Sequence, residues 1–246
     1  MEDLINLVKK KSEFQNLPDS IVEKALNSYE IQKIKDSEEK VKETRAFLRK
    51  YFTVFITNKL IGAKISGEEI LNKHMSSKNR DYEDLYEKLD LGDKTIVDLG
   101  AGLNGFSYPY FASNKYVAVE AIKVFVDVMN NYFQKDKLNA VAHNIDLFNL
   151  ASIKNLVKSE KSPIVFLFNV IDALEKLERD YSKKLLTEIV PISEKVVLSF
   201  PTRSLTGKSK FYTKRDWIID FIQEKFEILD DFEQGDERFI VFRSFA

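Results

Sequence analysis

From residue 94 onward the chain alternates short apolar runs with helical stretches, and this alternation restricts its fold more than any other feature. A parallel sheet with crossover helices is expected from such a pattern. Two further apolar runs, at 226–232 and 238–242, are close enough to form a hairpin. We therefore predict an α/β fold whose mainly parallel sheet ends in an antiparallel hairpin. The predicted parallel strands lie at residues 95–99, 116–120, 139–143, 164–168 and 195–200, with a helical stretch at 172–189.

The residues before this alternation contain helical patterns only. Ser20 and Glu23 have the spacing of a capping box, in which two side chains satisfy backbone groups of a helix's first turn, and Asp36 and Glu39 repeat that spacing. Residues 47–55 place apolar side chains on one face of an amphipathic helix. We therefore predict an all-helical domain over residues 1–90 and the α/β domain over residues 91–246.

The composition excludes several kinds of protein. Because none of the 246 residues is cysteine, disulfides, cysteine nucleophiles and cysteine-ligated metals are impossible, and only two histidines argue against a histidine metal site. No apolar stretch reaches the ~18–20 residues of a membrane span. No secretory leader pattern follows Met1. We expect a cytoplasmic monomer without metal or membrane association.

Three of the eight glycines fall within six residues, directly after the predicted strand at 95–99. Gly100 allows a sharp turn, and Gly102 removes a side chain where a ligand would press on the backbone. Together with Gly105 they also satisfy the nicotinamide-dinucleotide pattern, which by itself is weak evidence. Asp98 favours a different ligand, because a carboxylate opposes a pyrophosphate but attracts the ammonium and sulfonium groups of S-adenosylmethionine.

Carboxylates also follow the next two predicted strands. Glu120 is placed to accept hydrogen bonds from ribose hydroxyls, and Asp146 to accept one from the adenine amino group. A glycine-rich turn is often only a turn, and an Asp at a strand end is often only a helix cap. Carboxylates at three successive strand ends nevertheless favour S-adenosylmethionine as the cofactor. The predicted fold is the Rossmann-like fold of class I methyltransferases. A nicotinamide enzyme is the alternative. The predicted site includes the neighbouring residues Ala101, Asn104, Ala121, Leu147 and Asn169.

Residues and motifs that the sequence lacks reduce the number of possible methyl acceptors. C5-pyrimidine methylation usually needs a cysteine nucleophile. Residues 169–172 read Asn-Val-Ile-Asp, without the Asn/Asp-Pro-Pro-aromatic motif common among enzymes that methylate exocyclic amines. An acceptor with a free lone pair and no proton to lose is favoured: guanine N7, a small-molecule nitrogen or a thiolate. We assign no catalytic residue.

A basic segment follows the predicted strand at 195–200. Residues 195–215 contain six Lys or Arg residues and no acidic residue, although the formal net charge of the chain is -1. Basic residues beside Phe211 and Tyr212 suit phosphate contact and base stacking. A solvated surface loop is the simpler interpretation, and composition alone does not decide between them.

Five blocks spread over nearly the whole chain resemble the 16S ribosomal RNA guanine-N7 methyltransferases of the aminoglycoside-resistance group. The most specific block is Ser199-Phe-Pro-Thr-Arg-Ser-Leu-Thr-Gly207, which is nearly identical to the family's pattern. Leu103 and Asn104, after the second glycine, make the cofactor loop more specific than the general glycine pattern. The other blocks are residues 10–22, His74-Met-Ser-Ser-Lys-Asn-Arg80 with Leu85 and Tyr86, and Ala173-Leu-Glu-Lys176.

This resemblance implies a helical domain that docks on ribosomal RNA and a catalytic domain that methylates guanine N7 in the decoding region of the small ribosomal subunit. It implies that Arg80 lies near the donor's carboxylate, and that Arg203 and Lys208 lie at the catalytic cleft or the RNA. With Ser204, Lys210 and Phe211 these two form the predicted RNA-binding set. The biological role could be drug resistance or housekeeping. Two alternatives to an rRNA methyltransferase also stay open: a small-molecule methyltransferase and a non-catalytic ribosome-binding protein.

Overall fold

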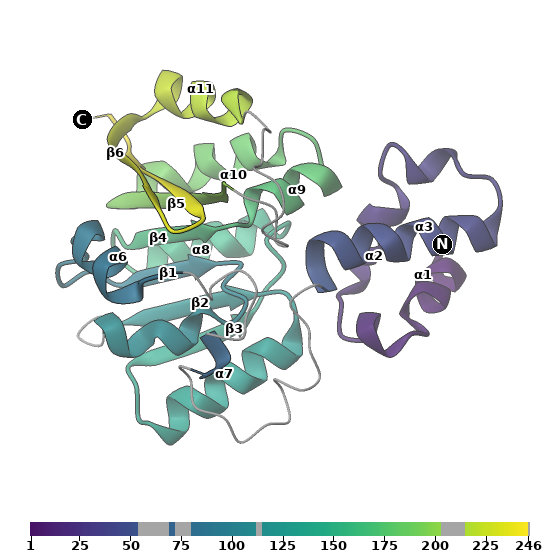
Figure 1. The fold of residues 1–246 in the computed structure, drawn as a ribbon, viewed down its shortest axis with the longest axis horizontal. Helices are drawn as coiled ribbons and strands as arrows, with labels where there is room; N and C mark the ends of the chain where they lie inside the picture. Colours follow the sequence, from purple (N-terminus) through teal and green to yellow (C-terminus); the bar gives the residue numbers. More distant parts are fainter. Residues whose placement is uncertain (54–68, 72–79, 112–114, 203–214, 246) are drawn as a thin grey trace.

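The computed structural model describes residues 1–53, 69–71, 80–111, 115–202 and 215–245. These residues contain one seven-stranded sheet with the order β3-β2-β1-β4-β5-β7-β6 (Figure 1). Strands β1 to β5 pair in parallel, whereas β7 runs antiparallel to both β5 and β6. The predicted Rossmann-like methyltransferase fold with its terminal hairpin is confirmed. The strands are β1 Ile96–Leu99, β2 Tyr116–Glu120, β3 Ala140–Asn144, β4 Ile164–Phe168, β5 Lys195–Pro201, β6 Glu227–Gln234 and β7 Glu237–Arg243.

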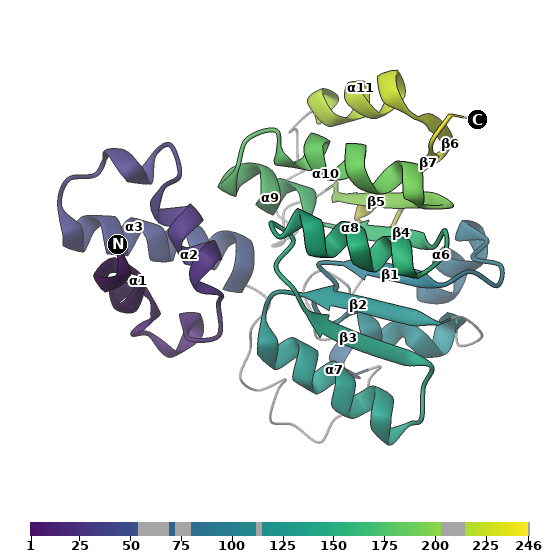
Figure 2. The same ribbon diagram turned by 180° about the vertical axis from the view of Figure 1, so that it is seen from behind.

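Helices cover both faces of this sheet, because successive strand side chains point to opposite faces and most are apolar. One core joins Ile96, Tyr116 and Phe166 to helices α6 (Tyr82–Leu89) and α7 (Lys123–Lys135) and to the 3-10 segment Asn104–Phe111. The other joins the alternate strand residues to the four helices seen on the opposite side in Figure 2. These are α8 Leu150–Ser159, α9 Ile171–Leu177, α10 Tyr181–Ile189 and α11 Asp216–Lys225.

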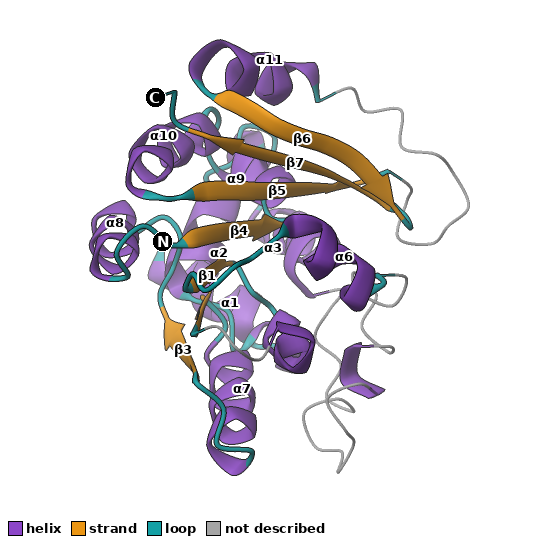
Figure 3. Ribbon diagram, turned by 90° about the vertical axis from the view of Figure 1, so that its left-hand side faces the viewer, coloured by secondary structure: helices purple, strands orange, loops and turns teal. Residues whose placement is uncertain are grey.

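One predicted helical stretch is interrupted. Residues 172–189 form two helices, because α9 ends where Glu178 has an extended backbone, with φ of -148°, and Asp180 before α10 is left-handed, with φ of 61°. Asp180 therefore starts a second helix instead of continuing the first. Figure 3 shows how α9 and α10 lie against the sheet, which twists from β6 at one end to β3 at the other.

The described part of the N-terminal region is helical throughout, as predicted. It contains α1 (Glu2–Lys9), α2 (Asp19–Leu26) and α3 (Ser37–Leu48), with 3-10 turns between them and a π-helical turn at Arg49–Thr53. Asp36 caps α3, because its carboxylate accepts the backbone N–H of Glu39 at 2.8 Å. Ser20 does not cap α2, since this helix begins at Asp19.

Helix α6 precedes the predicted domain boundary at residue 90 but packs on the sheet. Its Tyr86 ring stacks on Phe166 of β4 at 6.1 Å, and the Tyr86 hydroxyl is 2.6 Å from Oγ of Ser107. The side chains of α6 thus belong to the core of the α/β unit. No helix in the described ranges is both long and apolar enough to cross a membrane.

Candidate active site

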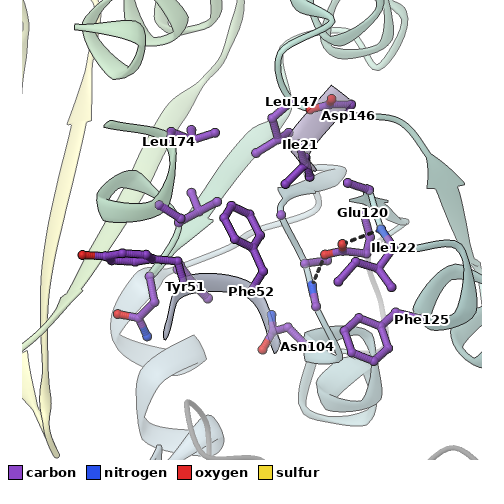
Figure 4. A pocket seen from close by; sticks show the side chains of 18 of the residues that line it. Ile21, Tyr51, Phe52, Asn104, Glu120, Ile122, Phe125, Asp146, Leu147 and Leu174 are labelled. Carbon is purple, nitrogen blue, oxygen red and sulfur yellow. Dashed lines mark hydrogen bonds between the residues drawn. The ribbon is translucent and has the colours of Figure 1, made fainter. Parts of the chain in front are cut away.

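A pocket opens beside the carboxyl ends of β1, β2 and β4, where ligands bind in open α/β sheets (Figure 4). Every residue predicted for the donor site except Asp98 lines it. Three further lining residues, Ile21, Tyr51 and Phe52, come from the N-terminal helical region. The predicted residues in the lining are Arg80, Gly100, Ala101, Gly102, Asn104, Glu120, Ala121, Asp146, Leu147 and Asn169.

The glycine loop has the conformation that its spacing suggests. Gly100 has a φ of +76°, and a Cβ atom there would lie 2.6 Å from Cγ2 of Val170. Gly102 has a φ of +54°, but no described atom lies within 4 Å of the position of its Cβ. Gly100 is therefore required by packing, whereas Gly102 leaves open space at the pocket wall.

The carboxylate of Glu120 is held by two backbone amides. Its Oε2 accepts the N–H of Gly102 at 2.9 Å, and its Oε1 accepts the N–H of Ile122 at 2.8 Å. Burial raises the pKa of Glu120, against the opposing effect of these hydrogen bonds. Each carboxylate oxygen can accept a further hydrogen bond. Glu120 is therefore an oriented acceptor pair at the pocket wall, as Figure 4 shows.

Asp98 lies behind the glycine loop and is only 1% exposed. Its Oδ2 accepts hydrogen bonds from Nδ2 of Asn104 at 2.8 Å and from the Tyr116 hydroxyl at 2.7 Å. Its Oδ1 has no hydrogen-bond partner among the described residues. Burial raises the pKa of Asp98 to about 6. Asp98 therefore lies behind the pocket lining and contacts it through Asn104.

Arg80 lines the pocket as part of a buried polar network. Its Nη2 is 2.8 and 2.9 Å from the two carboxylate oxygens of Glu237, and its Nη1 is 3.1 Å from Oδ1 of Asn104. The guanidinium also lies over the ring of Phe168, 4.8 Å from its centroid. Ser199 of β5 donates its hydroxyl to Glu237 at 2.9 Å. Glu237 thus fixes the position of the arginine.

Asp146 is hydrogen-bonded from both sides. Its Oδ1 accepts the N–H of Phe148 at 3.0 Å, and its Oδ2 accepts the hydroxyl of Ser20 in α2 at 2.6 Å. The carboxylate therefore joins the loop after β3 to the helical region.

Most of the apolar lining was not predicted as part of the site; the exceptions are Ala101, Ala121 and Leu147. The sequence pattern at 47–55 predicts one apolar face of an amphipathic helix. In the structure Tyr51 and Phe52 belong to the π-helical turn that follows α3, and both line the pocket. Nothing in the local sequence distinguishes a helix face buried in its own domain from one that lines a neighbouring pocket. The other unpredicted lining residues are Ile21, Ile122, Phe125, Phe148, Phe168, Val170, Ala173 and Leu174.

The predicted RNA-binding residues lie outside the described residues, as does residue 74. Two cations of the same basic segment are described, and both have internal partners. Arg215 is 7% exposed and pairs with Asp172 at 2.6 Å, and Nζ of Lys195 is 2.6 Å from the carbonyl oxygen of Leu89. Neither is available as a free surface charge. The predicted RNA-binding residues that lie outside the described residues are Arg203, Ser204, Lys208, Lys210 and Phe211.

No protein-family model matches the chain. A curated relative, the 16S rRNA (guanine(1405)-N(7))-methyltransferase of Proteus mirabilis, is 25% identical in an alignment of 194 positions that covers 70% of this chain. The match spans 63% of that relative's length, so it covers less than two thirds of it.

Solved structures share the fold over nearly the whole chain. The 16S rRNA methyltransferase RmtF, solved in complex with S-adenosyl-L-homocysteine, has a TM-score of 0.78 at 15% identity and matches 99% of this chain and 98% of its own. The 16S rRNA methylase RmtB has a TM-score of 0.77 at 16% identity, with coverage of 99% and 98%. ArmA, another 16S rRNA methylase, reaches 0.59 at 19% identity over 76% and 95%. The chain is thus similar in sequence to one 16S rRNA methyltransferase and shares the fold of others, which is the group that its motifs resemble.

Proposed function

We propose that the chain is an S-adenosylmethionine-dependent methyltransferase that modifies guanine N7 in the decoding region of small-subunit ribosomal RNA. The observation that carries the proposal is the oriented Glu120 carboxylate beside the open space at Gly102, at the edge of the sheet where this fold binds ligands. The similarity to a curated guanine-N7 methyltransferase supports the choice of acceptor.

The charges around the pocket suit a cationic donor. The carboxylates of Glu120 and Asp146 line it, and Asp98 lies buried behind its glycine loop. Arg80 is the cation in this lining, and Glu237 neutralises it. The remaining negative charge favours a ligand with ammonium and sulfonium groups over a pyrophosphate, which argues against a nicotinamide dinucleotide.

Different residues of the pocket lining would bind different parts of the donor. Glu120 would accept the ribose hydroxyls, and Asp146 and Leu147 would hold the adenine. The loop at 100–104 and Arg80 would hold the amino-acid end. Apolar side chains, among them Phe52 and Phe125, would exclude water from the reacting groups.

The bound donor supplies a methyl group on a sulfonium sulfur. Guanine N7 would form a bond to the methyl carbon with its free lone pair as the carbon–sulfur bond breaks and S-adenosylhomocysteine leaves as a thioether, so the protein need not remove a proton. The contribution of the chain is to align the acceptor with the methyl group and to exclude water, since positioning can account for much of a rate enhancement. Asn169, directly after β4, is a polar residue of the lining that could contact the acceptor.

The RNA would be held by the helical region and by the segment after β5, through Arg203, Ser204, Lys208, Lys210 and Phe211. Basic side chains neutralise phosphates, and an aromatic ring can stack on an unpaired base. Changing Arg203 and Lys208 together to Ala should lower methyl transfer to RNA and leave donor affinity intact. Equal loss of both would identify the segment as part of the donor site or the fold.

The direct experiment is to incubate the chain with radiolabelled S-adenosylmethionine and, separately, with intact small subunits, naked rRNA and tRNA. Label in the small subunit alone, mapped to N7 of a decoding-region guanine, is the expected result. Label in tRNA alone, or bound donor with no transfer to any RNA, would contradict the proposal.

A further inference from the structure

Helix α2 of the N-terminal region contacts the rim of the pocket through one face. Ser20 donates its hydroxyl to Oδ2 of Asp146 at 2.6 Å, and Ile21 lines the pocket. One turn further along, Nζ of Lys24 lies 4.3 Å from the ring centroid of Phe148 and 2.6 Å from Oε2 of Glu178. Three successive positions of one helical face thus meet the loop after β3 and the end of α9.

The Ser20 hydroxyl is not used to begin its own helix. Helix α2 starts at Asp19, with Pro18 in the capping position, and the hydroxyl reaches across 126 positions of sequence instead. With the N–H of Phe148 on Oδ1, the Asp146 carboxylate receives one donor on each oxygen. A carboxylate held at both oxygens has little freedom to rotate, and each oxygen can still accept a ligand hydrogen bond.

We propose that Ser20 is a positioning residue for the methyl donor, because it orients Asp146 toward the adenine amino group and so makes the helical region part of the donor site. This inference rests on the proposed function, which places adenine at Asp146. An acceptor that is already oriented binds its donor more tightly than one that must first be ordered.

The test is calorimetry of S-adenosylhomocysteine binding to the full chain and to three variants. Ser20→Ala removes the hydroxyl, whereas Ser20→Thr keeps it. Ser37→Ala is the matched control, because Ser37 is an exposed serine in the first turn of α3 and is not part of the pocket lining. We expect Ser20→Ala to weaken binding about three- to tenfold, the effect of one net hydrogen bond. Ser20→Thr and Ser37→Ala should leave it within about twofold of the original.

A second ligand separates positioning from a general effect on the fold. In the analogue of S-adenosylhomocysteine that carries purine in place of adenine, the amino group is replaced by hydrogen, so this edge of the base has no N–H to donate to Asp146. We expect this analogue to bind the original chain and Ser20→Ala equally. An equal loss for both ligands would overturn the inference, because it would mean that Ser20 acts on the structure as a whole.

Asp146→Ala and Glu120→Ala distinguish failure of this inference from failure of the proposed function. If both weaken S-adenosylhomocysteine binding and Ser20→Ala does not, the donor site stands and the role of Ser20 is wrong. If neither weakens it, or if the original chain does not bind the ligand, the placement of the donor is wrong and the role of Ser20 falls with it.

Discussion

Arg80 and Glu237, 157 positions apart in the chain, form a buried ion pair in which one guanidinium nitrogen contacts both carboxylate oxygens at 2.8 and 2.9 Å. Their side chains are 4% and 9% exposed. The pair joins the segment just before α6 to the start of β7, so it connects two distant segments of the α/β unit at the pocket.

Glu237→Ala should therefore be strongly destabilising. Removing the carboxylate leaves the Arg80 charge buried without its counter-ion, which costs about 3–5 kcal/mol of unfolding free energy. Chemical denaturation measures this loss. Glu227→Ala is the control, because Glu227 pairs with Arg243 at the surface, with the two side chains 39% and 46% exposed, and should cost no more than about 1 kcal/mol. Similar losses for both variants would contradict the buried pairing.

Glu120→Ala should weaken donor binding. The substitution removes both acceptor oxygens and leaves the amides of Gly102 and Ile122 without their partner. Loss of hydrogen bonds to a charged group should lower the affinity for S-adenosylhomocysteine about ten- to hundredfold in calorimetry. Glu188→Ala, which removes a surface carboxylate paired with Lys154, should bind as the original chain does. Unchanged affinity of Glu120→Ala would refute the ribose assignment.

Three glycines with positive φ, namely Gly100 and Gly102 in the site and Gly92 before β1, should differ in their response to alanine. Gly92→Ala introduces only the left-handed strain of a side chain, roughly 1–2 kcal/mol, because no described atom lies within 4 Å of its Cβ position. Gly100→Ala adds the close contact with Val170 and should cost about 1–3 kcal/mol more.

Gly102→Ala should resemble Gly92→Ala in thermal or chemical unfolding, since both have a φ of +54° and open space at the Cβ position. Only Gly102→Ala should lower donor affinity, because its methyl group projects at the pocket wall. Equal donor affinity of the two variants would show that the ligand does not approach this loop.

Asp98 should make the fold less stable as the pH rises from about 4 to about 6. Its pKa is raised by burial from 3.8 to about 6, so the folded chain keeps a proton that the unfolded chain releases in this range. The charged carboxylate thus destabilises the fold above this range, by about 3 kcal/mol for a shift of this size, and the destabilisation disappears as the pH falls. Asp98→Asn removes this titration.

The measurement is the unfolding free energy of the original chain and of Asp98→Asn between pH 4 and pH 8. The variant should gain stability relative to the original as the pH rises through this window, because only the original acquires the buried charge. A constant difference between them would show that Asp98 does not titrate near pH 6.

Local patterns in the chain were enough to predict the sheet. Strand residues such as Val117 and Phe166 form short apolar runs, which are buried on both faces only when helices cover the sheet on either side. The interruption at Asp180 escaped prediction, because the residues around it carry apolar side chains at helical spacing and only the backbone departs from a helix. The predicted capping role of Ser20 is wrong for a related reason: its spacing to Glu23 fits a cap, but its hydroxyl donates instead to Asp146, in the loop after β3.

The sequence by itself determined the strand–helix alternation, the glycine loop and the carboxylates that follow the strands, because these depend on conformations and burial set within a few residues. Only the tertiary structure decided that Asp98 lies behind the pocket, that Glu237 holds Arg80, and that Ser20, Tyr51 and Phe52 of the helical region complete the site. Such contacts join segments far apart in the chain, and packing selects them from many pairings that local sequence allows equally.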